Sequence, residues 1–410
     1  MRARQRGGLT PKKDLHDHAS LWHDSAHRTL RATALTRDVE CKVAVVGAGI
    51  TGALTALLLT DAGHDVVILD RRAPGSGSTV ASTAMIQFEI DQPLTALSKR
   101  IGPRKAQRVY QRSFQAVRDL SDLIADHRLR ARWEDRPALY LAGNTFGHRA
   151  LQDEARARQR LGLPSEYLDG RTIENDYRIE RTGGILSRGS AELDPAQTCA
   201  SCLKRARELG ARLYVPVNVT GIEAEGKMLR LSTEDGPAVT CRKVVFATGY
   251  EVVDGVPRDS FDIVSSWAIA TKPVGTQDFW PERCLIWEAS DPYLYVRSAR
   301  DNRILVGGED SGLTDPKRRA SAIANKSRTL LDKARSLLGL PGLEIDYAWA
   351  GAFAENPKGL PVFKALENIP GAYAILGCGG NGITFSVIGG QIVERWVAGK
   401  HDPDAELFAA

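Results

Sequence analysis

The chain has 410 residues, of which 43% are hydrophobic and 26% charged, a composition typical of a globular protein long enough for two domains. The formal net charge of +5 is small for this length, so no nucleic-acid partner is expected. No stretch approaches about eighteen consecutive apolar residues, so we predict no membrane span. The N-terminus lacks the apolar core of a secretory signal and the six cysteines are scattered, so we expect a cytoplasmic protein with reduced thiols.

Residues 1–40 are polar and weakly patterned. We expect them to form an N-terminal arm that packs on the surface or stays mobile, with Trp22 as a candidate anchor. The eight histidines of the chain show no metal-ligand spacing, so no metal site is predicted.

The segment 42–70 is the most informative part of the chain. An apolar strand enters a glycine turn, a helix leaves the turn, and a second apolar strand ends at Asp70. Gly47 permits the tight turn, Gly49 lets the backbone approach a pyrophosphate, and Gly52 allows the helix to pack closely on the strand. The spacing therefore predicts a dinucleotide site, with phosphates at the helix N-terminus and ribose hydroxyls at the acid. The candidate contacts in this segment are Gly47, Gly49, Ile50, Thr51, Gly52, Asp70 and Arg71.

Three further segments favour FAD, because an enzyme that binds only NAD needs no more than the first motif. Residues 75–83 place small hydroxyl side chains where a ribityl chain needs donors and close approach. Residues 247–249 resemble the second strand-end motif of flavoproteins with two dinucleotide-binding domains. Residues 379–382 open a helix whose positive end can stabilise the negative charge of a reduced flavin. The remaining candidate FAD contacts are Ser78, Ser82, Thr83, Val219, Ala247, Thr248, Gly249, Gly351, Gly379, Gly380, Asn381, Gly382 and Ile383.

These segments are far apart in the sequence, so we expect an α/β protein with a discontinuous FAD-binding domain. We assign residues 41–95, 185–265 and 345–400 to a Rossmann-like FAD-binding domain. Such a domain has a parallel sheet with helices on both faces. Several short strands appear between residues 267 and 308, and we assign residues 96–184 and 266–344 to a second, substrate domain.

Candidate substrate contacts lie in this region of short strands. Tyr293, Tyr295 and Arg297 alternate along one strand, so all three project from the same face of the sheet. The tyrosines can form the wall of an amine pocket and Arg297 can pair with an anionic substrate end, although a sheet face closed by a surface arginine explains the pattern equally well. Glu309 and Asp310 are candidates to hold a cationic amine, but loop carboxylates mostly face solvent.

The chain resembles the D-amino-acid oxidase/glycine oxidase family of FAD-dependent oxidoreductases over roughly residues 40 to 400. The resemblance implies a substrate domain built on an antiparallel sheet that covers the flavin. It implies hydride transfer from a carbon bearing an amine to flavin N5. It also implies an imine product that water hydrolyses, and reoxidation by oxygen in the oxidase members. It rests on residues 42–70, 75–85, 194–195, 247–249, 303–308, 348–351 and 377–383.

The chain departs from the family pattern where a substrate carboxylate is held. Glycine-oxidase-like members have an arginine just after the Trp-Ala-Gly turn and another in the C-terminal glycine turn. Here the positions read Ala352-Phe353 and Gly379-Gly380, which supply no guanidinium fork. The sequence therefore looks closer to the branches that oxidise amines or polyamines.

Other functions stay open at this point. Sarcosine-oxidase-like members have a lysine for oxygen activation near the position of Leu305, so either oxygen or an electron carrier can reoxidise the flavin. The chain can also be a flavin-binding subunit of a hetero-oligomeric dehydrogenase, or a flavin oxidase acting on a modified tRNA base. The sequence does not indicate the oligomeric state.

Overall fold

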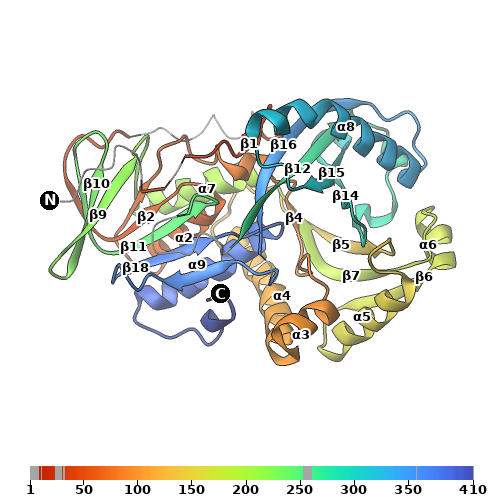
Figure 1. Ribbon diagram of the computed structural model, residues 1–410, viewed down its shortest axis with the longest axis horizontal. Helices are drawn as coiled ribbons and strands as arrows, with labels where there is room; N and C mark the ends of the chain where they lie inside the picture. Colours follow the sequence, from red (N-terminus) through yellow and green to blue (C-terminus); the bar gives the residue numbers. More distant parts are fainter. Residues whose placement is uncertain are drawn as a thin grey trace.

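The computed structural model describes residues 9–10, 12–23, 30, 33–252, 261–356 and 358–409. Two β-sheets occupy the two halves of the molecule, and helices cover them (Figure 1). The α/β architecture expected from the sequence, a Rossmann-like half and a second sheet domain, is confirmed.

The first sheet has eight strands in the order β17-β18-β11-β2-β3-β8, with β9 and β10 continuing from β11. The strands from β18 to β8 are parallel, and β17 is antiparallel at one edge. The sheet consists of β2 (Val39–Val46), β3 (Val66–Leu69), β8 (Arg212–Tyr214), β9 (Val219–Glu225), β10 (Met228–Thr233), β11 (Val239–Gly249), β17 (Val362–Ala365) and β18 (Ala372–Leu376).

The helices in the described part of the chain that pack on this sheet lie on one of its faces. Helices α2 (Ile50–Asp61), α7 (Pro195–Glu208) and α9 (Gly382–Val397) pack on Val43 and Val45 of β2. Ala44 points to the opposite face and joins a core formed with β9 and β10. The sequence predicts helices on both faces; here a pair of antiparallel strands buries the second face, which also satisfies the requirement that a parallel sheet be covered on both sides.

The second sheet has ten strands in the order β1-β16-β12-β15-β14-β13-β5-β7-β4, with β6 paired to β7. Helix α8 (Pro316–Leu338) covers its outer face (Figure 1), and the pairing is antiparallel except between β5 and β13. The strands are β1 (His16–Asp17), β4 (Met85–Ile86), β5 (Glu134–Leu141), β6 (Ser165–Asp169), β7 (Gly183–Glu192), β12 (Asp262–Thr271), β13 (Leu285–Glu288), β14 (Leu294–Ala299), β15 (Arg303–Ser311) and β16 (Ile345–Glu355).

Among the described residues, four further α-helices lie beside the two sheets, and α4 packs against α9. They are α3 (Leu94–Ile101), α4 (Pro103–Asp126), α5 (His148–Arg160) and α6 (Gly170–Tyr177). No helix in the described part of the chain combines the length and the apolar character needed to cross a membrane.

The two sheets do not divide the chain at the boundaries expected from the sequence. Strands β7 and β16 fall in segments assigned to the FAD-binding domain, yet both belong to the second sheet. The reason is long-range pairing: β16 pairs with β12 from Ile345 to Glu355, and β7 pairs with β5 and β6. Such pairings are invisible to local pattern analysis, and the domain division itself stays a prediction.

The described part of the N-terminal arm is packed into the body of the protein. Strand β1 extends the second sheet by pairing with β16. Arg319, which is 1% exposed, forms an ion pair with Asp17, with Nε of the arginine 2.5 Å from Oδ2 of the aspartate. Trp22, the expected anchor, is also 1% exposed, and its Nε1 donates to the carbonyl of Ser82 at 2.8 Å. The arm therefore ties the second sheet to the loop after β3.

Candidate active site

A cavity of about 660 Å³ lies between the two sheets. One side is formed by the ends of β2, β3 and β11 and by the N-termini of α2 and α9, and the other side by β12, β14, β15 and β16. The carboxyl ends of parallel strands are where open α/β sheets bind ligands. Nineteen of the predicted cofactor residues line this cavity: Gly47, Gly49, Ile50, Thr51, Asp70, Arg71, Ser78, Ser82, Thr83, Val219, Ala247, Thr248, Gly249, Gly351, Gly379, Gly380, Asn381, Gly382 and Ile383.

The first glycine turn has no room for side chains. Gly47 has a φ of +117°, and a Cβ there would overlap the carbonyl oxygen of Ala247 in β11. A Cβ at Gly52 would overlap the carbonyl of Gly47, so Gly52 packs beneath the turn and does not line the cavity. At Gly49 a Cβ would lie 3.3 Å from Oγ1 of Thr79. The turn therefore presents bare backbone to the cavity, as a pyrophosphate requires.

Asp70, at the end of β3, stabilises the same turn. Its Oδ2 accepts from the backbone N–H of Ala48 at 2.6 Å, and its Oδ1 accepts from the backbone N–H of Arg72 at 2.8 Å. Burial raises the pKa of Asp70, and these two hydrogen bonds oppose the increase. Each carboxylate oxygen has a second lone pair, so Asp70 can still accept from a ribose hydroxyl.

A cluster of charges closes the β3 end of the cavity, and the sequence indicated only Arg71 of its members. Glu251 is 3% exposed; it accepts from Arg72 Nη2 at 2.6 Å and pairs with Arg71. The backbone N–H of Lys13 donates to Glu251 at 2.8 Å, and Arg71 Nη1 donates to the carbonyl of Thr10 at 3.0 Å. Burial raises the pKa of Glu251, but hydrogen bonds from Arg72 and Lys13 outweigh it and lower the pKa overall. The hydrogen bonds from Lys13 and to Thr10 thus hold the N-terminal arm over the β3 end of the cavity.

The C-terminal glycine turn opens α9 toward the cavity. The side chain of Asn381 does not cap the helix. Its Nδ2 donates to the carbonyl of Glu89 at 2.8 Å, and its Oδ1 accepts from the backbone N–H of Asp91 at 3.1 Å. The helix N-terminus therefore presents its partial positive charge to the cavity, while the turn is held to residues 89–91.

Tyr295 of β14 and Tyr293, just before this strand, line the cavity opposite the glycine turns. Their ring centroids are 5.7 Å apart, and Tyr293 contacts Trp287 edge-on at 6.4 Å. A Cβ at Gly307 of β15 would overlap the ring of Tyr295, so this glycine makes room for the tyrosine. Burial raises the pKa of Tyr295 to about 12 and that of Tyr293 well above its ordinary value. Both phenols therefore stay protonated at neutral pH.

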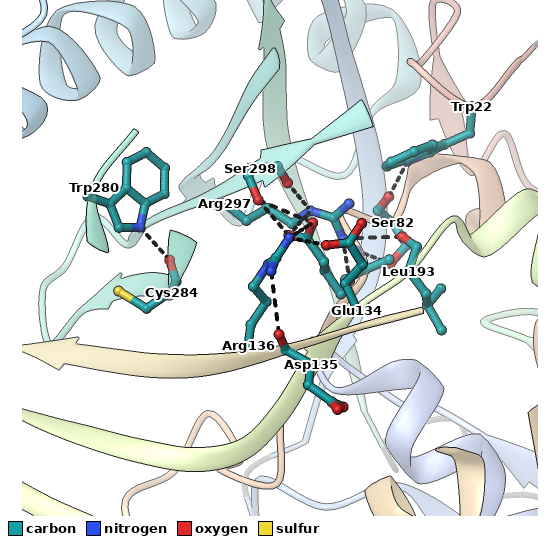
Figure 2. Close-up of polar contacts among 12 residues, drawn as sticks. Trp22, Ser82, Glu134, Asp135, Arg136, Leu193, Trp280, Cys284, Arg297 and Ser298 are labelled. Atoms are coloured by element: carbon teal, nitrogen blue, oxygen red, sulfur yellow. Dashed lines mark hydrogen bonds and ion pairs between the residues drawn. The ribbon is translucent and has the colours of Figure 1, made fainter. Parts of the chain in front are cut away.

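Arg297 lies on the same strand but does not line the cavity. It is 3% exposed, and Figure 2 shows its guanidinium near Ser298 and Leu193. It donates to the carbonyls of Ser298 at 2.8 Å, Ala84 at 2.6 Å and Leu193 at 3.2 Å. Its charge lies 3.6 Å from Glu192. The backbone of Ala84 and Leu193 and the ring of Trp22 enclose Arg297, so the structure does not bring it together with the tyrosines.

The two adjacent carboxylates at the end of β15 point in opposite directions. Glu309 lies outside the cavity and pairs with Lys326 at 3.1 Å and with Lys333. Asp310 lines the cavity beside Ser266. Burial, together with the nearby carboxylates, raises the pKa of Asp310 to about 7, although a hydrogen bond with Ser266 opposes the increase. Of the two candidates named from the sequence, the cavity contains only Asp310.

Three further acids at the cavity surface were missed by sequence reasoning. They come from segments distant in the chain and carry no motif, so no local signal could have identified them. Among the described residues, no group of three or more His, Cys, Asp or Glu is arranged to hold a metal ion. The three acids are Asp91, Asp291 and Glu355.

A cavity with a dinucleotide cradle on one side and a second sheet above it is typical of two-domain flavoprotein oxidoreductases. Residues 42–396 match the family described as FAD dependent oxidoreductase, and the chain belongs to this family. It is therefore an enzyme with FAD as its cofactor, in a family that acts on amines or amino acids.

The similarity to individual proteins extends over most of the chain. Gamma-glutamylputrescine oxidoreductase of Escherichia coli strain K12 is 26% identical over 410 residues, covering 96% of this chain and 91% of that protein. Glycine oxidase of Bacillus licheniformis is 25% identical over 381 residues, covering 87% and 92%. The crystal structure of glycine oxidase from Geobacillus kaustophilus has a TM-score of 0.74 at 20% identity, covering 89% and 96%, and shares the fold.

The residues present fit FAD. The bare turn at Gly47 and Gly49, the uncapped N-terminus of α9 and the acid at Asp70 are the features that a flavin dinucleotide needs at its phosphates, ring and ribose.

Proposed function

We propose that this enzyme removes a hydride from the carbon next to the nitrogen of an amine, giving an imine that water hydrolyses, in the cavity lined by Tyr293 and Tyr295. FAD, when bound at the turn formed by Gly47 and Gly49, supplies the hydride acceptor. Oxygen or an electron carrier then reoxidises the flavin. The observation that carries the proposal is the cavity lining, in which a dinucleotide cradle lies opposite two tyrosines.

An amine fits this lining better than an α-amino acid does. Where glycine-oxidase-like members have arginines, Ala352-Phe353 and Gly379-Gly380 line the cavity. Among the described lining residues the basic side chains are Arg71 and Arg72, and both bind Glu251. A substrate carboxylate would therefore find no available guanidinium fork. The name of the E. coli relative, gamma-glutamylputrescine oxidoreductase, also supports an amine.

The residues that line the cavity can bind and orient an amine without acting as a base. Tyr293 and Tyr295 keep their protons at neutral pH, so they pack against the carbon chain and exclude water. Only a neutral amine has the lone pair that assists hydride loss. We therefore expect the reduction rate to rise with pH as the bound ammonium loses its proton.

The test is an anaerobic titration of the purified protein. Amines and D- and L-amino acids are added separately, and the flavin absorbance is followed. Bleaching by amines supports the proposal, and readmission of air then distinguishes oxygen from a carrier as the acceptor. Bleaching by amino acids alone would contradict it, whereas a yellow protein that no donor bleaches would favour a flavin-binding subunit.

A further inference from the structure

The substrate end of the cavity is acidic. Four carboxylates line it on elements from different parts of the chain, and the basic residues among its described lining belong to the Glu251 cluster at the cofactor end. A cavity with this balance favours cations over anions. The four acids are Asp91, Asp291, Asp310 and Glu355.

Asp310 has an unsatisfied oxygen in this cavity. Its Oδ1 is completely buried and, within the described residues, has no hydrogen-bond partner. A buried acceptor without a partner costs free energy, which a ligand N–H would recover. Gln87, 7% exposed on the same cavity lining, likewise has a buried amide nitrogen without a partner among the described residues. Both observations point to a polar ligand that completes the site.

Asp91 lies directly against the C-terminal glycine turn. A Cβ at Gly380 would lie only 2.6 Å from Asp91 Oδ2, so the glycine leaves the space that this carboxylate fills. The side chain of Asp91 is exposed to the open cavity, although protein atoms surround it. The loss of bulk solvent, and then the charge of Glu355, raise the pKa of Asp91. A bound cation would relieve this repulsion.

The acidic lining continues into a smaller neighbouring cavity of about 320 Å³. The two cavities share Asp91 and Glu355, and the smaller one adds Asp262. Arg100 also lines the smaller cavity and is the basic group that faces these acids there. The arrangement offers a path for an elongated ligand, from the tyrosines toward the outer acids.

We propose that the substrate of this cavity carries two positive charges: the reacting amine, and a second ammonium group several carbons away that binds Asp310, with Asp91 and Glu355 beside it. The chemical class is therefore an α,ω-diamine or a longer polyamine. This assignment rests on the proposed amine oxidation and adds the group that selects among amines. A charged ammonium donates to the unsatisfied oxygen of Asp310 and neutralises the neighbouring carboxylates.

The test compares pairs of amines that differ only in the second charge. The α,ω-diamines from 1,3-diaminopropane to 1,6-diaminohexane are each paired with the n-alkylamine of the same chain length. Flavin reduction is measured anaerobically in stopped flow at pH 8, where Asp310 is ionised, and binding is measured from the perturbation of the flavin spectrum before reduction begins. The expected result is that diamines have a kcat/KM about 10- to 100-fold above their monoamine partners.

Asp310→Asn should remove most of this preference, because it weakens the diamine far more than the monoamine of the same chain length. Glu309→Gln is the matched control, because it neutralises the adjacent carboxylate outside the cavity and should keep the preference. If Asp310→Asn loses FAD, Asp91→Asn replaces it and should reduce the preference in the same direction.

Equal rates for diamines and monoamines in the wild type, or an equal loss for both in Asp310→Asn, would overturn the second-charge assignment and leave amine oxidation intact. No reduction of the bound flavin by any amine would instead overturn the proposed function itself.

Discussion

Asp310→Asn should make the substrate-free holoenzyme more stable at alkaline pH and leave it unchanged at acid pH. Burial is the main reason that the pKa of Asp310 rises from 3.8 to about 7. The folded state then binds the proton more tightly than the unfolded chain, so stability falls as the pH rises from about 4 to 7. A shift of about three pKa units corresponds to about 4 kcal/mol for a fully buried group. Asp310 is half-buried, so solvent screening reduces this value. We expect Asp310→Asn to raise the free energy of unfolding above that of the wild type by about 2 kcal/mol at alkaline pH, or to raise Tm by about 4 °C.

The assay is thermal unfolding of both proteins between pH 4.5 and 8.5, with flavin content checked by absorbance. Glu309→Gln is again the control, because its effect has the opposite sign. Burial raises the pKa of Glu309, but Lys333 and Lys326 outweigh it and lower the pKa overall. Glu309→Gln should therefore destabilise the protein by about 1 kcal/mol at pH 7, with a smaller effect as the pH falls. A difference between Asp310→Asn and wild type that is the same at pH 5 and pH 8 would refute this reasoning.

Three further substitutions test the rest of the site. Gly47→Ala should lower FAD affinity by at least about tenfold, since the new Cβ would overlap the Ala247 carbonyl, and the flavin-to-protein absorbance ratio measures this. Glu251→Gln should speed FAD release by about tenfold, since the half-buried Arg72 loses its charged partner, and a rate unchanged in dilution experiments would contradict that role. Arg297→Met should lower Tm by several degrees while leaving KM for amines within about twofold; a selective rise in KM would place Arg297 at the substrate after all.

The cofactor side was predictable because its determinants are local in sequence. The turn at Gly47, the helix that follows and Asp70 lie within one strand-turn-helix-strand unit, and each glycine is required by backbone geometry that any such unit must adopt. The chain belongs to the FAD-dependent family, as the resemblance implied. The cluster around Glu251 was not predictable, because it joins the arm to a residue more than two hundred positions away.

The substrate side depended on the tertiary structure. Strand alternation predicts that Tyr293, Tyr295 and Arg297 share one face, but it could not show that other elements cover the end that holds Arg297. It also could not show which of Glu309 and Asp310 faces the cavity, since that depends on where α8 places its lysines.

The amino-acid sequence by itself determined the dinucleotide cradle, the flavin cofactor and the family, because these follow from short backbone motifs whose geometry is fixed by neighbouring residues. Only the tertiary structure decided the charge of the substrate end. Asp310 and Glu355 lie on β15 and β16, which both pair with β12, and Asp91 lies against the C-terminal glycine turn, so the three acids meet only in the folded chain. Burial and nearby carboxylates raise their pKa values.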